Sequence, residues 1–189
     1  YRYRNPIVEE NTLFVTISQS GETADTLAAL EYARAEKYIG IVTICNVPTS
    51  TMARVADWKI FTNAGPEIGV ASTKAFTTQL AALLMLALSI AKCQDKNADK
   101  RKQATQELRE TPALVDQTFN LKENISQITQ NISTKHNALF LGRGMYFSIA
   151  QEGALKLKEI SYIHAEAYPA GELKHGPLAL VDEQIPVIA

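Results

Sequence analysis

Residues 13–23 read Leu13-Phe14-Val15-Thr16-Ile17-Ser18-Gln19-Ser20-Gly21-Glu22-Thr23. The first five are apolar or β-branched, which predicts a buried strand, and a helix-like pattern starts near Thr23. Between them lies a turn rich in hydroxyls, in which Gly21 allows close approach of a ligand. Such a turn directs N–H groups, hydroxyls and the positive end of a helix at one point, so it can hold an anion without Lys or Arg. The sequence predicts a phosphate site here; the alternative is that the hydroxyls only cap the helix.

The composition predicts a globular protein with a small-molecule partner. The 189 residues allow one large domain or parts of two, and an apolar fraction of 46% suffices for a buried core. A net charge of −1 argues against a nucleic-acid or membrane-binding surface. The apolar segment Leu80–Ala91 is shorter than the roughly 20 residues that cross a bilayer, and no signal peptide is visible. Cys45 and Cys93 form neither a disulfide framework nor a metal knuckle, so we expect a cytoplasmic protein.

Strand-like and helix-like runs alternate along the first half of the chain. After the first strand, the pattern predicts a helix over 23–38, a strand over 39–45, a short helix over 50–55 and a strand over 58–62. A long helix over 74–92 has almost no polar face, so we expect it to be buried. This alternation predicts an α/β fold, a parallel sheet flanked by helices.

The second half begins with a polar helical segment and then returns to the α/β pattern. Thr111-Pro112 fits an N-cap followed by a proline in the first turn of a helix. A strand over 138–141, a Gly142-Arg143-Gly144 turn, a helix over 146–162, an irregular stretch and an apolar run from Ile185 follow. We therefore predict a first domain over 1–92, a helical connector over 93–136 and the start of a second domain over 137–189. Both ends, including residues 1–6, read as mid-domain, so we expect a piece of a larger protein.

Two further segments carry residues suited to chemistry. Ser72 and Thr73 lie near the start of the long helix, where they either cap it or meet a ligand. Glu152, Lys156 and Glu159 share one helix face, where a carboxylate beside a lysine can act as a general base. The alternative for this face is a solvated row of ion pairs.

The histidines and glycines of the second half suggest proton transfer but no cofactor. His175 lies between residues that break regular structure, where an imidazole can exchange protons near neutral pH. A metal site from His164, Glu166 and His175 lacks any standard ligand spacing. Phe147 occupies the place of the third glycine of a dinucleotide fingerprint. We therefore expect neither a metal nor a nicotinamide cofactor.

Four segments together resemble the sugar-isomerase (SIS) region of the glucosamine-6-phosphate synthase family, the glutamine:fructose-6-phosphate amidotransferases. These are residues 18–23 (SQSGET), 67–77 (EIGVASTKAFT), 152–159 (EGALKLKE) and 172–177 (ELKHGP). The first motif marks the wider SIS fold, and all four in this order are more specific. The resemblance implies most of one SIS subdomain, lacking its first strand, and the start of a second.

The resemblance also implies an activity and its residues. The family makes glucosamine 6-phosphate from fructose 6-phosphate and glutamine-derived ammonia. By position, the phosphate would be held by Ser18, Gln19, Ser20 and Thr23, and the sugar would meet Val70 and Ser72. Glu159 would move the proton between C1 and C2 with help from Lys156, and His175 would open the sugar ring.

In this family the histidine serves the neighbouring subunit's site, so a homodimer is implied. The glutaminase domain of the family and the C-terminal tail with its lysine are absent, so we expect this piece alone to be inactive. Two other readings stay open. One is a stand-alone SIS sugar-phosphate isomerase or deaminase, and the other is a non-enzymatic sugar-phosphate sensor.

Overall fold

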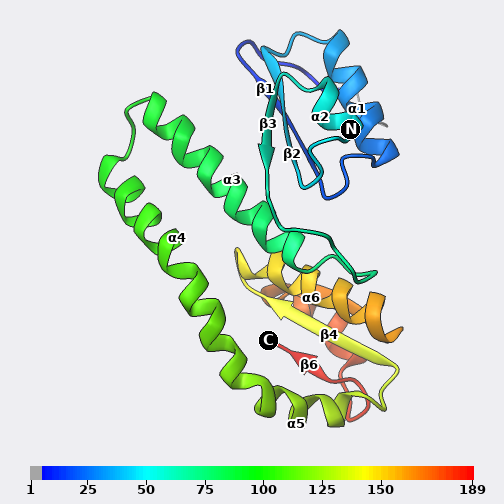
Figure 1. The fold of residues 1–189 in the computed structure, drawn as a ribbon. Helices are drawn as coiled ribbons and strands as arrows, with labels where there is room; N and C mark the ends of the chain where they lie inside the picture. Colours follow the sequence, from blue (N-terminus) through cyan, green and yellow to red (C-terminus); the bar gives the residue numbers. More distant parts are fainter. Residues whose placement is uncertain (1–5) are drawn as a thin grey trace. The chain divides into compact units, whose positions relative to one another are not determined.

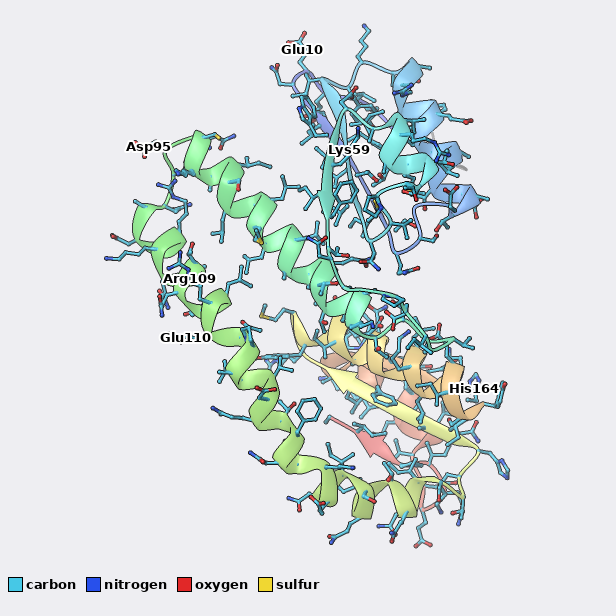
Figure 2. All side chains as sticks on the ribbon, in the orientation of Figure 1. Glu10, Lys59, Asp95, Arg109, Glu110 and His164 are labelled. Atoms are coloured by element: carbon cyan, nitrogen blue, oxygen red, sulfur yellow. The ribbon has the colours of Figure 1, made fainter. Side chains whose placement is uncertain are left out.

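A computed structural model describes residues 6–189 and divides the chain into two compact units, Tyr1–Arg109 and Glu110–Ala189 (Figure 1). The boundary lies between Arg109 and Glu110, both labelled in Figure 2, within the predicted connector 93–136. The expectation of a mid-domain start concerns residues 1–6, of which 1–5 lie outside the described residues.

The first unit contains a parallel sheet whose strand order is β1-β2-β3. Its strands are β1 (Leu13–Ser18), β2 (Gly40–Cys45) and β3 (Trp58–Phe61). Its helices are α1 (Ala24–Ala35), α2 (Thr51–Val55), α3 (Lys74–Cys93) and the first part of α4 (Ala98–Thr118). The predicted α/β class is confirmed, and α1 ends three residues before the expected Tyr38 because the backbone at Glu36 is extended.

The core of the first unit lies between the sheet and the two helices α1 and α2, which Figure 1 shows on one side of the strands. Leu30 of α1, Ile41 of β2 and Met52 of α2 form its centre. Thr16 and Thr43, both buried on neighbouring strands, satisfy each other through a hydroxyl hydrogen bond of 2.8 Å. This packing holds β1 and β2 in register up to the pair Ser18 and Cys45, where the functional loops begin.

Helix α3 differs from the sequence expectation, because it is mostly exposed among the described residues. Only Ala75 and Ala82 are buried, while four large apolar side chains are exposed: Leu80, Leu84, Met85 and Ile90. A small sheet can cover only one stripe of a helix that is apolar all round. At 20 residues, α3 is also longer than the segment Leu80–Ala91, and by length and composition alone it could cross a membrane, as some core helices of soluble proteins also could.

The second unit contains a second parallel sheet, of order β5-β4-β6. Its strands are β4 (Asn137–Gly142), β5 (His164–Pro169) and β6 (Val187–Ile188), and its helices are α5 (Lys122–Ile132) and α6 (Tyr146–Ser161). Short 3₁₀ segments are η1 (Phe119–Leu121), η2 (Ala170–His175) and η3 (Pro177–Leu180). Helix α6 packs closely on β4, since a Cβ at Gly153 would lie 2.9 Å from the Phe140 ring.

Two sequence expectations about the second half are wrong. The stretch after α6 is not wholly irregular, because β5 alternates the inward alanines Ala165 and Ala167 with polar residues and so lacks an apolar run. Thr111-Pro112 does not start a helix: α4 begins at Ala98 and Pro112 lies inside it. Pro112 has no N–H to donate to the carbonyl of Leu108, one turn earlier, so α4 continues through the proline with one helical hydrogen bond fewer.

Candidate functional site

The loop over residues 18–23, here called the hydroxyl loop, connects the carboxyl end of β1 to the start of α1. Ser18 is buried at the end of the strand, whereas Thr23 is exposed and stands at the N-cap position of α1. In parallel α/β sheets, ligands bind at the carboxyl ends of the strands. The structure therefore places the hydroxyl groups at the edge of the sheet where a ligand is expected.

Side-chain hydroxyls organise this loop. Ser18 Oγ lies 2.9 Å from Thr23 Oγ1 and also accepts the N–H of Gly21 at 3.0 Å. Ser20 Oγ accepts the N–H of Glu22 at 3.1 Å. The sequence predicts backbone N–H groups directed at a ligand, whereas the N–H groups of Gly21 and Glu22 are already bonded to hydroxyl oxygens. A hydroxyl that accepts in this way keeps its own proton for donation, so O–H groups of the loop are left to donate to an anion.

Thr23 does not use its side chain to cap α1, although capping was the alternative explanation for the hydroxyls. Its backbone is extended, as at most N-caps, but it makes no side-chain cap hydrogen bond and pairs with Ser18 instead. The start of a helix carries a partial positive charge that favours anions. Thr23 is therefore not a side-chain cap, and its hydroxyl lies at the start of α1 beside that of Ser18.

Contacts with α2 hold the hydroxyl loop in place. The carbonyl of Gly21 accepts the N–H of Met52 at 3.1 Å, and Glu22 Oε1 accepts the N–H of Thr51 at 2.7 Å. The bond from Thr51 lowers the pKa of Glu22, because it stabilises the ionised carboxylate. Gly21 has φ 69°, and a Cβ there would lie 2.2 Å from Ser50 Oγ. Only glycine fits this position.

A second loop, residues 64–73, connects β3 to α3 and carries two predicted sugar contacts. Val70 is fully exposed and Ser72 is half-buried. Thr73 occupies the N-cap position of α3, but its side chain makes no cap hydrogen bond. Glu67 caps the helix instead, since its Oε2 accepts the N–H of Ala75 at 3.2 Å. The sequence argument missed Glu67, because its partner lies eight residues further along the chain.

The acidic and basic residues of α6 form a compact ion-pair cluster in the second unit. Lys156 Nζ lies 2.5 Å from Glu159 Oε2 and 3.5 Å from Glu152 Oε1. The hydrogen bond to Glu159, with the charge of Glu152 adding to it, raises the pKa of Lys156. The side chains are between 21% and 34% exposed, so the cluster is a partly exposed row of ion pairs along one face of α6.

The histidines of the second unit occupy different settings. His175 ends the 3₁₀ turn η2, is exposed, and is followed by Gly176 at φ 136°. His164 starts β5 (Figure 2) and lies 3.4 Å from Glu166, which also accepts the hydroxyl of Tyr168. That hydroxyl lowers the pKa of Glu166. Among residues 6–189, no three His, Cys, Asp or Glu side chains gather as metal ligands would.

The site residues divide between the two units. The structure brings Ser18, Ser20 and Thr23 together in the first, and Lys156 and Glu159 together in the second. Gln19 belongs to the hydroxyl loop, and its carbonyl is bonded to the N–H of Asn46. His175 also belongs to the second unit.

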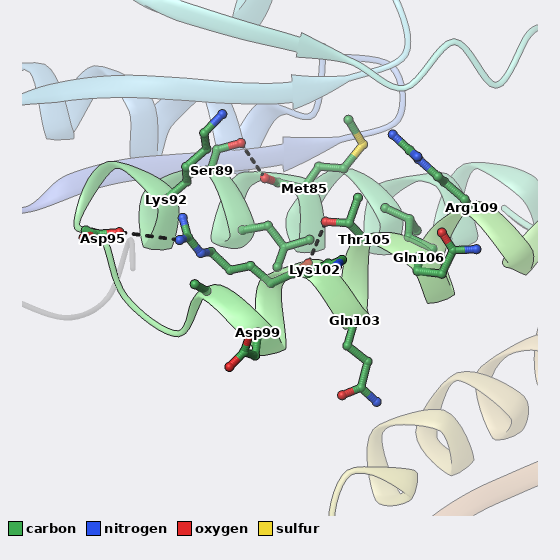
Figure 3. Close-up of a pocket in the computed structure, with 14 residues that line it drawn as sticks. Met85, Ser89, Lys92, Asp95, Asp99, Lys102, Gln103, Thr105, Gln106 and Arg109 are labelled. Atoms are coloured by element: carbon green, nitrogen blue, oxygen red, sulfur yellow. Dashed lines mark hydrogen bonds and ion pairs between the residues drawn. The ribbon is translucent and has the colours of Figure 1, made fainter.

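A groove of about 1330 Å³ lies elsewhere in the first unit, between α3 and α4 (Figure 3). Fourteen residues between positions 85 and 109 line it, among them Lys92, Asp95 and Arg101. Arg101 and Asp95 are 3.7 Å apart, and Ser89 bonds back to its own helix at Met85. Neither the hydroxyl loop nor the second loop contributes to this groove, so its size does not mark the site.

Comparison with known proteins agrees with the fold. The SIS domain family matches residues 1–89 and 131–189, leaving out most of the helical segment between the sheets. A glutamine–fructose-6-phosphate aminotransferase (isomerizing) from Legionella pneumophila (strain Lens) is 58% identical over all 189 residues. The chain spans 30% of the length of that relative.

Solved structures show the same likeness. The C-terminal domain of a glucosamine-fructose-6-phosphate aminotransferase from Francisella tularensis is 55% identical, with a TM-score of 0.95 over 98% of this chain and 53% of that one. A glucosamine-6-phosphate deaminase from Thermotoga maritima is 26% identical, with a TM-score of 0.75 over 97% of this chain and 53% of that one. The hydroxyl loop lies within the SIS match over residues 1–89 and within the full-length match to the Legionella relative.

Proposed function

The chain belongs to the SIS domain family, and from that premise we propose that it is the sugar-phosphate-binding and isomerising part of a glutamine–fructose-6-phosphate aminotransferase. The reaction would convert fructose 6-phosphate into glucosamine 6-phosphate with ammonia derived from glutamine. The identity of 58% over the whole chain supports this choice over the deaminase, whose likeness is 26%. The longer relatives support a glutaminase domain in the same polypeptide, and we also propose a cytoplasmic homodimer.

The hydroxyl loop is the observation that carries the proposal. Ser18 and Thr23 are coupled at 2.9 Å beside the start of α1, and Ser20 is fixed by Glu22. A sugar phosphate is a dianion with several acceptor oxygens, so it matches O–H donors placed at the positive end of a helix. No Lys or Arg is needed in the loop. Gln19 would add an amide donor at the same place.

Isomerisation requires a base that takes a proton from C1 and returns one to C2. Glu159 is suited to this task because Lys156 holds it at 2.5 Å. The raised pKa of Lys156 keeps that side chain an ammonium ion, which can stabilise negative charge on the sugar oxygen while the proton moves. His175 would assist ring opening, and Val70 and Ser72 would contact the sugar. Exposure of His175 is compatible with a role in a neighbouring subunit's site.

The proposal is tested by Glu159→Gln in the full-length polypeptide. This variant keeps the shape of the side chain but cannot take a proton, so kcat should fall about 100-fold or more, with KM for fructose 6-phosphate nearly unchanged. Glu123→Gln, an equivalent change in the first turn of α5, is the matched control and should leave both constants unchanged. Loss of sugar binding in Glu159→Gln, or full retention of kcat, would contradict the assigned role.

A further inference from the structure

Asn46 lies between the two loops of the first unit, and the sequence argument assigned it no role. It directly follows β2, the middle strand of the order β1-β2-β3. Because all three strands are parallel, their carboxyl ends lie side by side. Strand β1 leads into the hydroxyl loop, and β3 leads toward the second loop. Asn46 therefore stands where the two loops leave the sheet.

The main chain and the side chain of Asn46 bond to different loops. Its N–H donates to the carbonyl of Gln19 in the hydroxyl loop at 3.1 Å. Its Oδ1 accepts the N–H of Ala64 at 2.8 Å, and its Nδ2 donates to the carbonyl of Gly65 at 2.7 Å. A backbone N–H can only donate and a carbonyl can only accept, so this pair fixes the orientation of the amide. The side-chain amide of Asn46 therefore bonds to one N–H and one carbonyl of consecutive residues in the second loop, as the backbone of a neighbouring β-strand would.

The second loop is also fastened at its far end. Glu67 accepts the hydroxyl of Thr73 at 3.3 Å and the N–H of Ala75 at 3.2 Å. Asn46 holds the beginning of the loop at Ala64 and Gly65, and Glu67 holds its end at the start of α3. Val70 and Ser72, the predicted sugar contacts, lie between these two anchors.

We propose that Asn46 is a positioning residue that sets the second loop against the hydroxyl loop, and thereby determines how tightly the sugar part of a bound sugar phosphate is held. The inference rests on the proposed function of the two loops. The phosphate end depends on the hydroxyl loop, which the main-chain bond of Asn46 supports whatever its side chain is. The sugar end depends on the second loop, which the side chain of Asn46 supports. The two halves of the ligand should therefore respond differently to a change at Asn46.

The test compares Asn46→Ala with wild type in the full-length polypeptide, using two ligands. Fructose 6-phosphate reports on both loops, whereas inorganic phosphate, measured as a competitive inhibitor, reports on the hydroxyl loop alone. Loss of the two side-chain hydrogen bonds to the second loop should raise KM for fructose 6-phosphate about tenfold, while Ki for phosphate stays within about twofold. Asn124→Ala is the matched control, because Asn124 is exposed on α5 and lies outside both loops. It should change neither constant.

A second variant keeps the inference testable if Asn46→Ala fails to fold. Gly65 has φ 71° and open space around its Cα, so Gly65→Ala strains the loop at the other side of the same contact without a clash. It should raise KM for the sugar phosphate and leave Ki for phosphate unchanged. The double variant should be no worse than the poorer single variant, because both disturb one contact.

The outcomes separate the inference from the function on which it rests. An unchanged KM in both Asn46→Ala and Gly65→Ala would overturn the role of Asn46, and so would parallel increases of KM and Ki. If wild type binds neither fructose 6-phosphate nor phosphate, the proposed function fails and the inference falls with it. If wild type binds both and Thr23→Ala weakens both, the function stands and only the Asn46 variants decide the inference.

Discussion

Substitution of Thr23 by alanine tests the hydroxyl loop most directly, because it removes one hydroxyl and little else. Thr23 Oγ1 is paired with Ser18 Oγ at 2.9 Å and is free of any role in capping α1. Helix caps that use their side chain lose about 1 kcal/mol when cut to alanine, but Thr23 has no such bond to lose. The variant should therefore fold with nearly the wild-type melting temperature.

The effect on binding follows from the charge of the ligand. A hydrogen bond to a charged group contributes about 1.5 to 3 kcal/mol, which corresponds to roughly 10- to 150-fold in affinity. Removal of Thr23 also frees the Ser18 hydroxyl, which can turn toward the phosphate and recover part of the loss. We therefore expect the lower end, a rise of about tenfold in KM for fructose 6-phosphate, with kcat within about twofold.

The assay is steady-state kinetics of the full-length polypeptide, with Ki for inorganic phosphate measured in parallel. Both constants should rise together, because the lost donor faces the phosphate. Thr23→Ser should restore both, since it returns the hydroxyl. Thr129→Ala is the control: Thr129 is exposed on α5 and bonds only to the carbonyl of Ser126 in its own helix. A normal KM with a collapsed kcat in Thr23→Ala would refute the assignment of the loop to phosphate.

Two further predictions concern stability and the isolated chain. The hydrogen bond from the Thr51 N–H lowers the pKa of Glu22 in the folded protein. The ionised Glu22 carboxylate therefore stabilises the fold fully above pH 4.5, and this stabilisation is lost as the pH falls through the lowered pKa. The melting temperature of wild type should exceed that of Glu22→Gln at pH 7, and the gap should narrow as the pH falls below 4.5, whereas Glu31→Gln on α1 should show no such gap. The 189-residue chain by itself, which spans 30% of its Legionella relative, should form no glucosamine 6-phosphate from fructose 6-phosphate and ammonium; sustained product formation would contradict the need for the rest of the polypeptide.

Local sequence was enough to predict the first strand, the hydroxyl loop and α1. An apolar run that ends in Ser18 and a helix that starts one residue after Thr23 are signals within about a dozen neighbouring residues. The cluster on α6 could be predicted for the same reason, because Lys156 and Glu159 are three residues apart on a helix. Contacts between residues of the same helix or strand can therefore be predicted from their spacing in the sequence.

Features that depend on packing were harder to predict. Strand β5 is hidden in the sequence because its inward positions are Ala165 and Ala167, which are too small to produce an apolar run. The burial of α3 was misjudged because an apolar sequence shows what a helix can bury and not what covers it. The preference of proline for the first turn predicts a helix start at Pro112, yet α4 contains this proline in its interior and has no buried residues.

The anchors of the second loop show why the site could be predicted only in part. Asn46 reaches Ala64 and Gly65 across 18 and 19 residues, and this contact exists because β2 and β3 are neighbours in the sheet. The order β1-β2-β3 places the end of the middle strand between two loops that are about 45 residues apart in the sequence. A residue at that position can bond to both loops whatever their own sequences are. The sequence of the hydroxyl loop is enough to propose how a phosphate would be held, but only the sheet order shows why the residue proposed to link this loop to the second loop follows a third strand.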